Sequence, residues 1–319
     1  MTTFADQLFQ MGGVPVGMSF PTGGDSYFLD PANGNDDNDG KSVHLAFKTL
    51  TAAEDALTAN QNDVLYYLAG SSSISLSALL TWDKSYTHFI GVCAPVGVGN
   101  RARIFQTSSA TGLDPLINIT ASGCIFKNIY VFQGVDDATS LVTVQVTGAR
   151  NYFENCHFAG GGHAANAVDG AASLNLNGGH ENRFKHCTFG VDTIAAATGV
   201  ATLLFDNYAA RNIFEDCNFT LYAGAAGAKF VEIVDNKGFD RYIIFRDCLF
   251  INDATAVTLT EAFTIPGSMG NVTSRIILLG SMALGVMDWD TNDQGLIYSD
   301  RGTITAGGNA GLLQAAAKT

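Results

Sequence analysis

The stretch FENCHF, residues 153–158, decides the fold because close relatives of it return along the chain at nearly constant intervals. The further copies are FKNIYV at 126–131, FKHCTF at 184–189, FEDCNF at 214–219, FRDCLF at 245–250 and a degenerate LGSMAL from Leu279. The first five copies start 27, 31, 30 and 31 residues apart. Self-similarity with a period near thirty residues is typical of a solenoid in which each repeat forms one coil.

The alternation inside each copy indicates strands. The first Phe points inward, the next residue outward, two consecutive residues inward, one outward, and the last inward. The two adjacent inward positions indicate a bend between two strands, and an apolar segment such as Val142–Val146 adds a third strand before each copy. We therefore predict an all-β chain, a single-stranded right-handed parallel β-helix of about seven coils spaced by about 4.8 Å.

Two sets of residues are predicted to stack inside the coils, one of aromatic rings and one of thiols. They are Phe153, Phe184, Phe214 and Phe245, and Cys156, Cys187, Cys217 and Cys248. Stacked cysteines are spaced by one strand separation, which slightly exceeds the Cβ separation of a disulfide, so we interpret them as buried thiols. The alternative is a metal site or redox relay, although thiolate ligands must converge rather than stack.

An outer column alternates in charge along the coils and is predicted to fix their register. Its members are Lys127, Glu154, Lys185, Glu215 and Arg246. The turn that follows holds Asn128, Asn155, His186, Asp216 and Asp247. Amides there are expected to bond turn backbone groups. Asp216 above Asp247 is either a tolerated turn pair or a pair that shares a cation or a proton.

Composition limits the possible partners. Of 319 residues, 47% are hydrophobic and 15% charged, so a large core is available. The net charge is −13 and Lys and Arg do not cluster, which argues against nucleic acid as a partner. Met1 to Gly17 lacks the pattern of a signal peptide, and no apolar run is long enough for a membrane span. We therefore expect folding in a cytoplasm, where the six cysteines stay thiols.

Four segments are predicted: an N-terminal arm at 1–26, a first strand with an Asx-rich turn and capping helix at 27–70, the β-helix at 71–302, and a C-terminal tail at 303–319. The helix is predicted because Phe47, Leu50, Ala53 and Leu57 recur at helical spacing, with Glu54 and Asp55 on the other face. A solenoid needs such a cap because its end exposes the core and unpaired strand edges.

The Asx-rich turn NDDNDG at 35–40 holds Asp36, Asp37 and Asp39, whose hard oxygen donors suit Ca²⁺. The turn lacks the spacing of an EF-hand loop, and ordinary Asx-turn hydrogen bonding is the other interpretation. Apart from this candidate ion, the sequence predicts no cofactor and no metal site.

The N-terminal motifs resemble those of the pectin-lyase-like right-handed β-helix proteins. The residues concerned are Asp30-Pro-Ala-Asn-Gly-Asn, Asn38-Asp-Gly-Lys and Ala46-Phe-Lys-Thr-Leu before a helix. The rest looks most like β-helix proteins encoded among tailed-phage virion structural genes, through Gly12-Gly-Val-Pro-Val-Gly, Arg101-Ala-Arg-Ile, Ser122-Gly-Cys-Ile-Phe and Leu176-Asn-Gly-Gly-His-Glu-Asn. The resemblance covers nearly the whole chain and implies function only by association.

The sequence leans against an enzyme, and no catalytic residue is predicted. The resemblance implies acidic clusters for lyases and an NTD…DD…GHG pattern for hydrolases, but Asp136-Asp137 is an isolated pair and His163 and His180 lack that context. Asp216 and Asp247 remain open as a carboxyl pair. His157, His163, His180 and His186 fall within one coil's length and are interpreted as turn and surface residues, with a metal or acid–base role as the alternative.

The expected function is that of a structural virion protein of a tailed bacteriophage, a homotrimeric capsid decoration protein assembled in the host cytoplasm. Its arm would contact the major capsid protein or another virion protein through Phe4, Leu8, Phe9, Met11, Val14, Pro15 and Val16. One alternative is a tail spike that binds a host surface glycan, with possible depolymerase activity. Another is a carbohydrate enzyme unrelated to virions.

Overall fold

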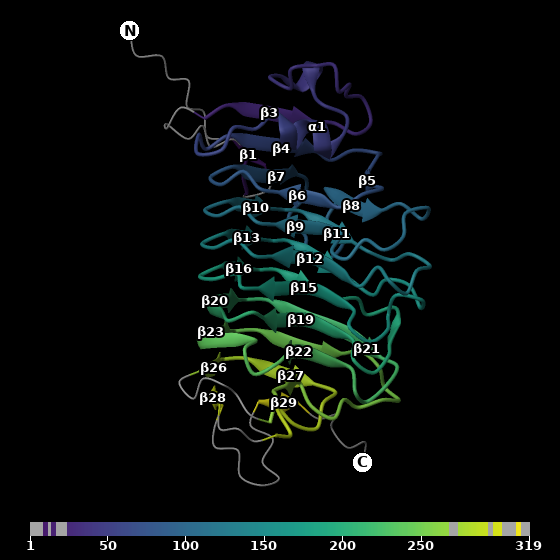
Figure 1. Cartoon of the computed structure of the whole chain (residues 1–319), viewed down its shortest axis with the longest axis vertical. Helices are drawn as coiled ribbons and strands as arrows, with labels where there is room; N and C mark the ends of the chain where they lie inside the picture. Colours follow the sequence, from purple (N-terminus) through teal and green to yellow (C-terminus); the bar gives the residue numbers. More distant parts are fainter. Residues whose placement is uncertain are drawn as a thin grey trace.

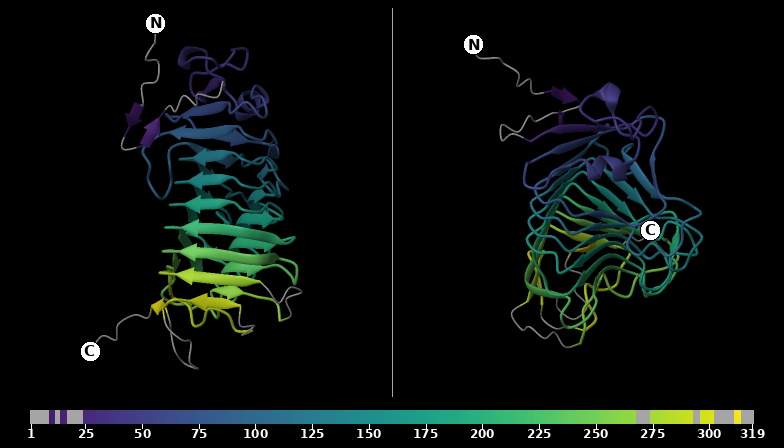
Figure 2. Two further views of the ribbon diagram at one scale, coloured as in Figure 1. Left: turned by 90° about the vertical axis from the view of Figure 1, so that its left-hand side faces the viewer. Right: turned by 45° about the horizontal axis from the view of Figure 1, so that its top comes forward.

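A computed structural model describes residues 24–267, 274–292, 296–301 and Gly311, together with the backbone of β1 (Phe9–Met11), β2 (Val14–Val16) and β29 (Leu312–Leu313) (Figure 1). The predicted fold class is confirmed. The chain is a right-handed parallel β-helix in which strands from successive coils lie one above another (Figure 2). No helix among the described residues is long and apolar enough to cross a membrane.

Three parallel sheets form the sides of the rod. Sheet 1 contains β3 (Ser26–Leu29), β4 (Val64–Leu68), β7 (His88–Val92), β10 (Ile125–Lys127), β13 (Tyr152–Glu154), β16 (Arg183–Lys185), β20 (Ala209–Glu215), β23 (Phe239–Arg246), β26 (Arg275–Leu279) and β28 (Ile297–Ser299). Sheet 2 contains β5 (Ile74–Leu76), β8 (Arg103–Gln106), β11 (Tyr130–Phe132), β14 (His157–Ala159), β17 (Thr188–Phe189), β21 (Asn218–Ala223), β24 (Leu249–Asn252), β27 (Met282–Leu284) and β29, with β18 (Ala195–Ala196) beside β21. Sheet 3 contains β6 (Leu80–Trp82), β9 (Ile117–Ile119), β12 (Val142–Val146), β15 (Ala172–Asn177), β19 (Ala201–Asp206), β22 (Lys229–Ile233) and β25 (Phe263–Thr264).

The phenylalanine stack runs through the inner face of sheet 1. Phe126, Phe153, Phe184, Phe214 and Phe245 pair in register from coil to coil. Their ring centroids are 5.0, 4.6, 4.7 and 4.9 Å apart, with nearly parallel planes. All five rings are buried, so each coil places its largest apolar side chain directly on that of the coil before.

The last copy of the repeat is displaced by one residue from its predicted position. Phe245 pairs with Leu278, so this copy begins at Leu278 and not at Leu279. Ser281 then occupies the cysteine position, and its hydroxyl donates to the carbonyl of Phe245 at 3.1 Å. Two adjacent leucines gave the sequence no indication of which one points inward.

A left-handed backbone conformation forms the turn between sheets 1 and 2. Asn128, Asn155, His186, Asp216 and Asp247 have φ between 51° and 57°, and Gly280 in the next coil has φ 64°. Among residues with a side chain, Asn and Asp adopt this conformation most readily. The backbone requirement therefore explains why this column contains short polar residues and finally a glycine.

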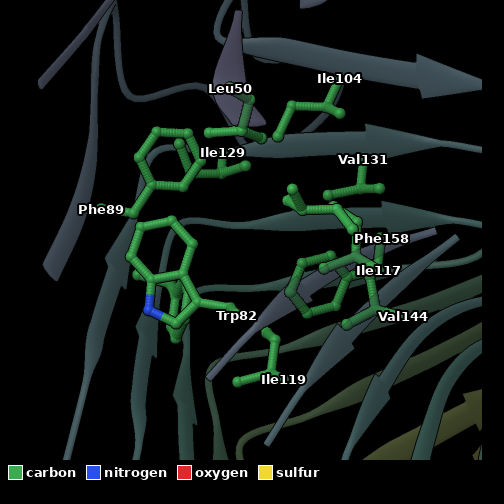
Figure 3. A pocket seen from close by; sticks show the side chains of 12 residues that line it. Leu50, Trp82, Phe89, Ile104, Ile117, Ile119, Ile129, Val131, Val144 and Phe158 are labelled. Carbon is green, nitrogen blue, oxygen red and sulfur yellow. The ribbon is translucent and has the colours of Figure 1, made fainter. Parts of the chain in front are cut away.

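The first coil is closed by helix α1 (Leu50–Asp55), which follows the short 3₁₀ helix η1 (Val43–Leu45). The Thr49 side chain accepts the N–H of Ala52 and caps the helix. Leu50, Ala53 and Leu57 join the main core. Leu50 lies over a small apolar void of about 20 Å³, among rings such as Trp82 and Phe89 (Figure 3). The predicted capping helix is therefore present, although it is only six residues long.

Glu54 differs from its predicted place on the outer side of this helix. Its side chain is buried and lies 3.4 Å from the ammonium group of Lys84. Burial raises the pKa of Glu54, and the charge of Lys84 opposes that shift. Asp55 remains exposed, as expected. A lysine from the following coil thus allows a carboxylate on the core side of the cap, which helical spacing alone does not indicate.

Candidate functional site

An overhanging loop at residues 93–100 joins β7 to sheet 2 and crosses the outside of the following coils. Three hydrogen bonds hold it down: the hydroxyl of Thr188 donates to the carbonyl of Gly97 at 2.6 Å, the N–H of Gly99 to Nδ1 of His157 at 3.1 Å, and the amide of Asn100 to the carbonyl of Asn155 at 2.6 Å. Because these partners belong to two further coils, the loop is fixed across the stack.

A groove of about 350 Å³ runs between this loop and the turn that joins sheets 1 and 2. It is lined by Pro95, Gly97, Lys127, Asn128, Glu154, Asn155, His186, Asp216 and Asn218. Lys127 lies 3.0 Å from Glu154, and His186 lies 3.4 Å from Asp216. The volume lies in the range of small-molecule sites, and the lining offers charged groups and amides that would bind hydroxyl groups.

His157 lies beneath the loop and not in the groove. Its ring is stacked on Tyr130, with centroids 4.7 Å apart. Nδ1 accepts the N–H of Gly99, so Nε2 carries the proton and donates to the carbonyl of Gly190 at 2.9 Å. Burial lowers the pKa of His157, and the bond to Gly190 opposes that shift. This histidine is therefore a neutral residue that anchors the loop.

The other candidate histidines and acids have separate partners. Nδ1 of His163 lies 3.9 Å from Asp136, and His180 accepts the N–H of Ala210 at 3.1 Å. Asp137 accepts hydrogen bonds from Ser140, Thr139 and Gly112, and these hydrogen bonds lower the pKa of its carboxyl group. The isolated Asp136-Asp137 pair thus organises its own loop.

Asp216 has His186 as a neighbour one coil earlier, with Nε2 3.4 Å from its carboxylate, a contact that the sequence did not predict. The sequence had placed Asp216 above Asp247, and the structure adds a histidine on the other side of Asp216. Asp247 lies next to Gly280, where a Cβ atom would approach its Oδ1 to 2.1 Å. Glycine at 280 therefore makes room for the carboxylate of the preceding coil.

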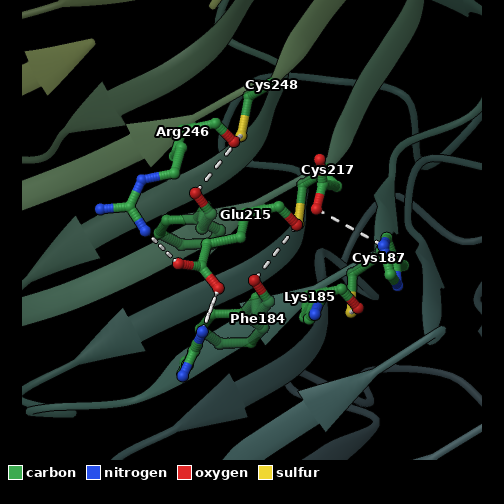
Figure 4. A network of polar contacts seen from close by, with 11 residues as sticks. Phe184, Lys185, Cys187, Glu215, Cys217, Arg246 and Cys248 are labelled. Atoms are coloured by element: carbon green, nitrogen blue, oxygen red, sulfur yellow. Dashed lines mark hydrogen bonds and ion pairs between the residues drawn. The ribbon is translucent and has the colours of Figure 1, made fainter. Parts of the chain in front are cut away.

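The outer charge column is paired more unevenly than predicted. Lys127 and Glu154 form the expected ion pair. The buried carboxylate of Glu215 is held between Arg246, as expected, and Arg183, which lies in the neighbouring column (Figure 4). Arg183 takes the place that the sequence interpretation gave to Lys185, because a long guanidinium side chain reaches diagonally across strands.

The cysteine column lies behind the same strands. Cys156, Cys187, Cys217 and Cys248 are buried and unpaired by disulfides. Each thiol faces the carbonyl of the phenylalanine one coil earlier, at 3.5 to 3.6 Å. Figure 4 shows this contact for Cys217 and Cys248. Burial raises the pKa of Cys156, Cys187 and Cys217 well above the usual value. Thiols in this state are poor nucleophiles and poor metal ligands.

The Asx-rich turn is closed by its own hydrogen bonds. Asp36 accepts the N–H groups of Lys48 and Thr49, both at 2.8 Å, and the hydroxyl of Thr49 at 2.9 Å. Burial alone would raise the pKa of Asp36, but these hydrogen bonds outweigh it and lower the pKa. Asp39 accepts the N–H of Lys41, and Asp37 donates its own N–H to Asn35. Within the described ranges, no three His, Cys, Asp or Glu side chains are grouped to hold a metal ion.

Two ladders at the opposite corner, between sheets 3 and 1, were missed by sequence reasoning. Inside, Asn151, Asn182 and Asn212 bond one another's backbone and carbonyls of the preceding coil. Outside, Glu181 bridges Arg150 at 2.7 Å and Arg211 at 2.5 Å. Both ladders were detectable in the sequence. An asparagine stands two residues before each of Phe153, Phe184 and Phe214, and a charged residue of alternating sign stands three residues before each of them.

The expected arm contacts lie mostly beyond the described side chains. Phe4 and Leu8 lie outside the described residues. Phe9 and Met11 belong to β1, and Val14, Pro15 and Val16 form β2, which pairs with β1 as an antiparallel hairpin. Only the backbone of this hairpin is described, so its contacts stay a prediction.

Solved structures with this fold include several pectin methylesterases. One in complex with a hexasaccharide has a TM-score of 0.55 and 14% identity, over 90% of this chain and 92% of that chain. The enzyme from Aspergillus niger has a TM-score of 0.55 and 15% identity, over 94% and 93%. ORF18 of Geobacillus virus E2 matches at a TM-score of 0.43 and 12% identity, over 75% of this chain and 50% of that chain. No family model and no curated protein matches the chain. These likenesses establish a pectin-lyase-like β-helix fold and no activity.

Proposed function

We propose that this chain is a structural virion protein of a tailed bacteriophage, a homotrimeric decoration protein of the capsid held by its N-terminal arm. The observation that carries the proposal is that the stacked charged side chains form ion pairs between coils. Glu215 is held by two arginines, Glu181 bridges two more, and Lys127 is paired with Glu154, in each case across coils. The charged columns therefore fasten the coils to one another and stiffen the rod.

A rigid rod with buried, unreactive thiols suits a protein that is assembled in a cytoplasm and must then survive on a particle surface. The arm at residues 1–26 supplies the apolar side chains that the sequence analysis assigns to contact with the major capsid protein. The rod itself would project from the shell, and it is about 43 Å long because the ten stacked strands of sheet 1 are spaced by about 4.8 Å.

Cryo-electron microscopy of the particle that carries this protein tests the proposal. Trimeric density at capsid threefold positions, with residues 1–26 on the shell, is the expected result. Deleting residues 1–23 should abolish attachment to particles and leave the free protein folded, whereas deleting residues 314–319 is the matched control. Density confined to the tail, or attachment without the arm, would contradict the proposal.

A second candidate function, a tail spike that binds a host surface glycan, is favoured by the groove beside the overhanging loop. Its amides, the Lys127–Glu154 ion pair and the His186–Asp216 pair are suited to hydroxyl groups. Saturation-transfer NMR with glycan fragments of the host surface would test it, using Asn218→Ala as the variant and Asp253→Asn, outside the groove, as the control. Release of reducing ends that stops in Glu154→Gln and Asp216→Asn would indicate a depolymerase.

A further inference from the structure

Two apolar patches lie on the outside of the C-terminal coils, on neighbouring sides of the rod. The sheet-1 patch consists of Ile213, Tyr242, Ile244, Ile277, Leu279 and Tyr298. The sheet-2 patch consists of Leu249, Ile251, Met282 and Leu284. The turn at Asp247 and Gly280 separates the two patches, so they share the same level along the rod and flank one corner.

The sheet-1 patch follows from the strand register. Ile213, Ile244 and Ile277 occupy equivalent positions in consecutive strands, and Tyr298 continues the column. The next residue after each isoleucine, which is Phe214, Phe245 or Leu278, points into the core. Strand alternation therefore directs the isoleucines, and Tyr298 in register with them, outward. Tyr298 is 50% exposed and Tyr242 36%. A flat surface of isoleucine and tyrosine bordered by arginine has the composition of a protein–protein interface.

The sheet-2 patch is built in the same way. Leu249 pairs with Met282, and Ile251 pairs with Leu284, which is 37% exposed. One coil earlier the equivalent positions hold the polar residues Asn218 and Thr220. The apolar surface therefore begins abruptly in the last coils, next to the sheet-1 patch around the corner.

We propose that the two patches bind each other between copies of this chain, the sheet-1 patch of one copy against the sheet-2 patch of the next. Two unlike patches on one molecule make a head-to-tail contact, and such contacts close into a ring when the rotation permits. In a closed ring of copies, both patches of every chain are covered. The charges also match, because Arg275 borders the sheet-1 patch and Asp253 borders the sheet-2 patch. The inference rests on the proposed homotrimer and identifies its surfaces.

Light scattering after gel filtration of the full chain is the first test. The wild-type protein should have three times the chain mass of 33.6 kDa. Ile244→Glu and Leu284→Glu should each reduce it to the mass of one chain, because assembly would bury an unpaired carboxylate. Val234→Glu is the matched control, since Val234 is 47% exposed at the end of a sheet-3 strand and should leave the trimer intact. A wild-type protein that stays monomeric at micromolar concentration overturns the proposal.

Mixing the two disrupted variants distinguishes this contact from a symmetric one. Ile244→Glu keeps an intact sheet-2 patch, and Leu284→Glu keeps an intact sheet-1 patch. Their equimolar mixture should form a dimer through the one intact pair of patches, which also shows that both variants are folded. If either patch instead bound the same patch of another copy, the variant that keeps that patch would associate by itself, before mixing, and this would refute the pairing of unlike patches.

A thiol probe covers the case in which the glutamate variants fail to fold. In Ile277→Cys the new thiol should react with a maleimide several-fold more slowly at a concentration where the chain is trimeric than after dilution to monomer, because assembly covers it. The thiol of Val234→Cys should react at the same rate at both concentrations. A rate for Ile277→Cys that does not change with concentration would overturn the proposal. All of these measurements use the free protein. They can therefore refute the proposed interface without refuting the capsid location, and microscopy of the particle can refute the location without refuting the interface.

Discussion

The inner face of sheet 1 carries phenylalanine in every coil from β10 to β23, whereas its outer face changes from coil to coil. The inner column is constrained by packing, since each ring must fit the rings above and below it. The outer column beside it reads Lys, Glu, Lys, Glu and Arg, with pairing that extends to Arg183 in the next column. Packing therefore determines which residues occur inside the coils, whereas ion pairing and contacts with partners determine which residues occur outside.

The largest difference between the two faces should come from placing a charge in each. Cys217→Asp buries a carboxylate in the thiol column, and forcing it to stay protonated at neutral pH costs about 5 kcal/mol or more of unfolding free energy. Asn218→Asp places the same group on the exposed neighbour and should cost less than about 0.5 kcal/mol. Urea unfolding measures both. Equal stability of the two variants would show that Cys217 does not point into the core.

Removing one ring should be the next largest effect. Phe184 is stacked 4.6 Å from Phe153 and 4.7 Å from Phe214, so Phe184→Ala should lower the free energy of unfolding by about 3–5 kcal/mol. Lys185→Ala, on the outer side of the same strand, should change it by about 0.5 kcal/mol or less. Thermal and urea unfolding compare the two, and a loss below about 1 kcal/mol for Phe184→Ala would argue against the stack.

Within the outer face, the most buried charge should matter most. Glu215→Gln removes the carboxylate between Arg183 and Arg246 and should cost about 2 kcal/mol, less than a fully buried pair because both arginines are half exposed. Glu154→Gln, at a more exposed carboxylate with one charged partner, should cost about 0.5 kcal/mol. If both variants lose the same stability in urea unfolding, the two-arginine arrangement adds nothing.

The smallest effect concerns the pH dependence of stability at His157, whose side chain points out of the coil but is buried by the overhanging loop. Burial lowers the pKa of His157 in the folded chain, so between that value and about 6.5 only the unfolded chain binds the proton. The contribution of His157 to the free energy of unfolding should therefore be fully present above about pH 6.5 and should decrease as the pH falls below it. His157→Gln should weaken this dependence by at most about 1.4 kcal/mol per pH unit. The dependence should not vanish, because burial also lowers the pKa of His88. Urea unfolding from pH 7.5 to 5 gives the slopes, and an unchanged slope would show that His157 titrates freely.

The sequence predicted the parts of this molecule that repeat. Phenylalanine, cysteine and turn positions recur in register, so the fold followed from spacing. Leu278 and Leu279 show the limit, because two adjacent apolar residues do not indicate which one points inward. Arg183 was missed since diagonal contacts depend on side-chain length. The groove could not be predicted, because the loop at 93–100 occurs once and contacts residues up to 91 positions away.

The outer charge alternation limits how such a rod can change its length. Lys127, Glu154, Lys185, Glu215 and Arg246 alternate in sign over five coils. Deleting one coil, such as residues 154–184, would bring Lys127 directly beside Lys185, whereas deleting two coils would restore a lysine next to a glutamate. Duplication or loss of coils during evolution should therefore be easiest in pairs, and a designed rod built from these repeats should be lengthened two coils at a time.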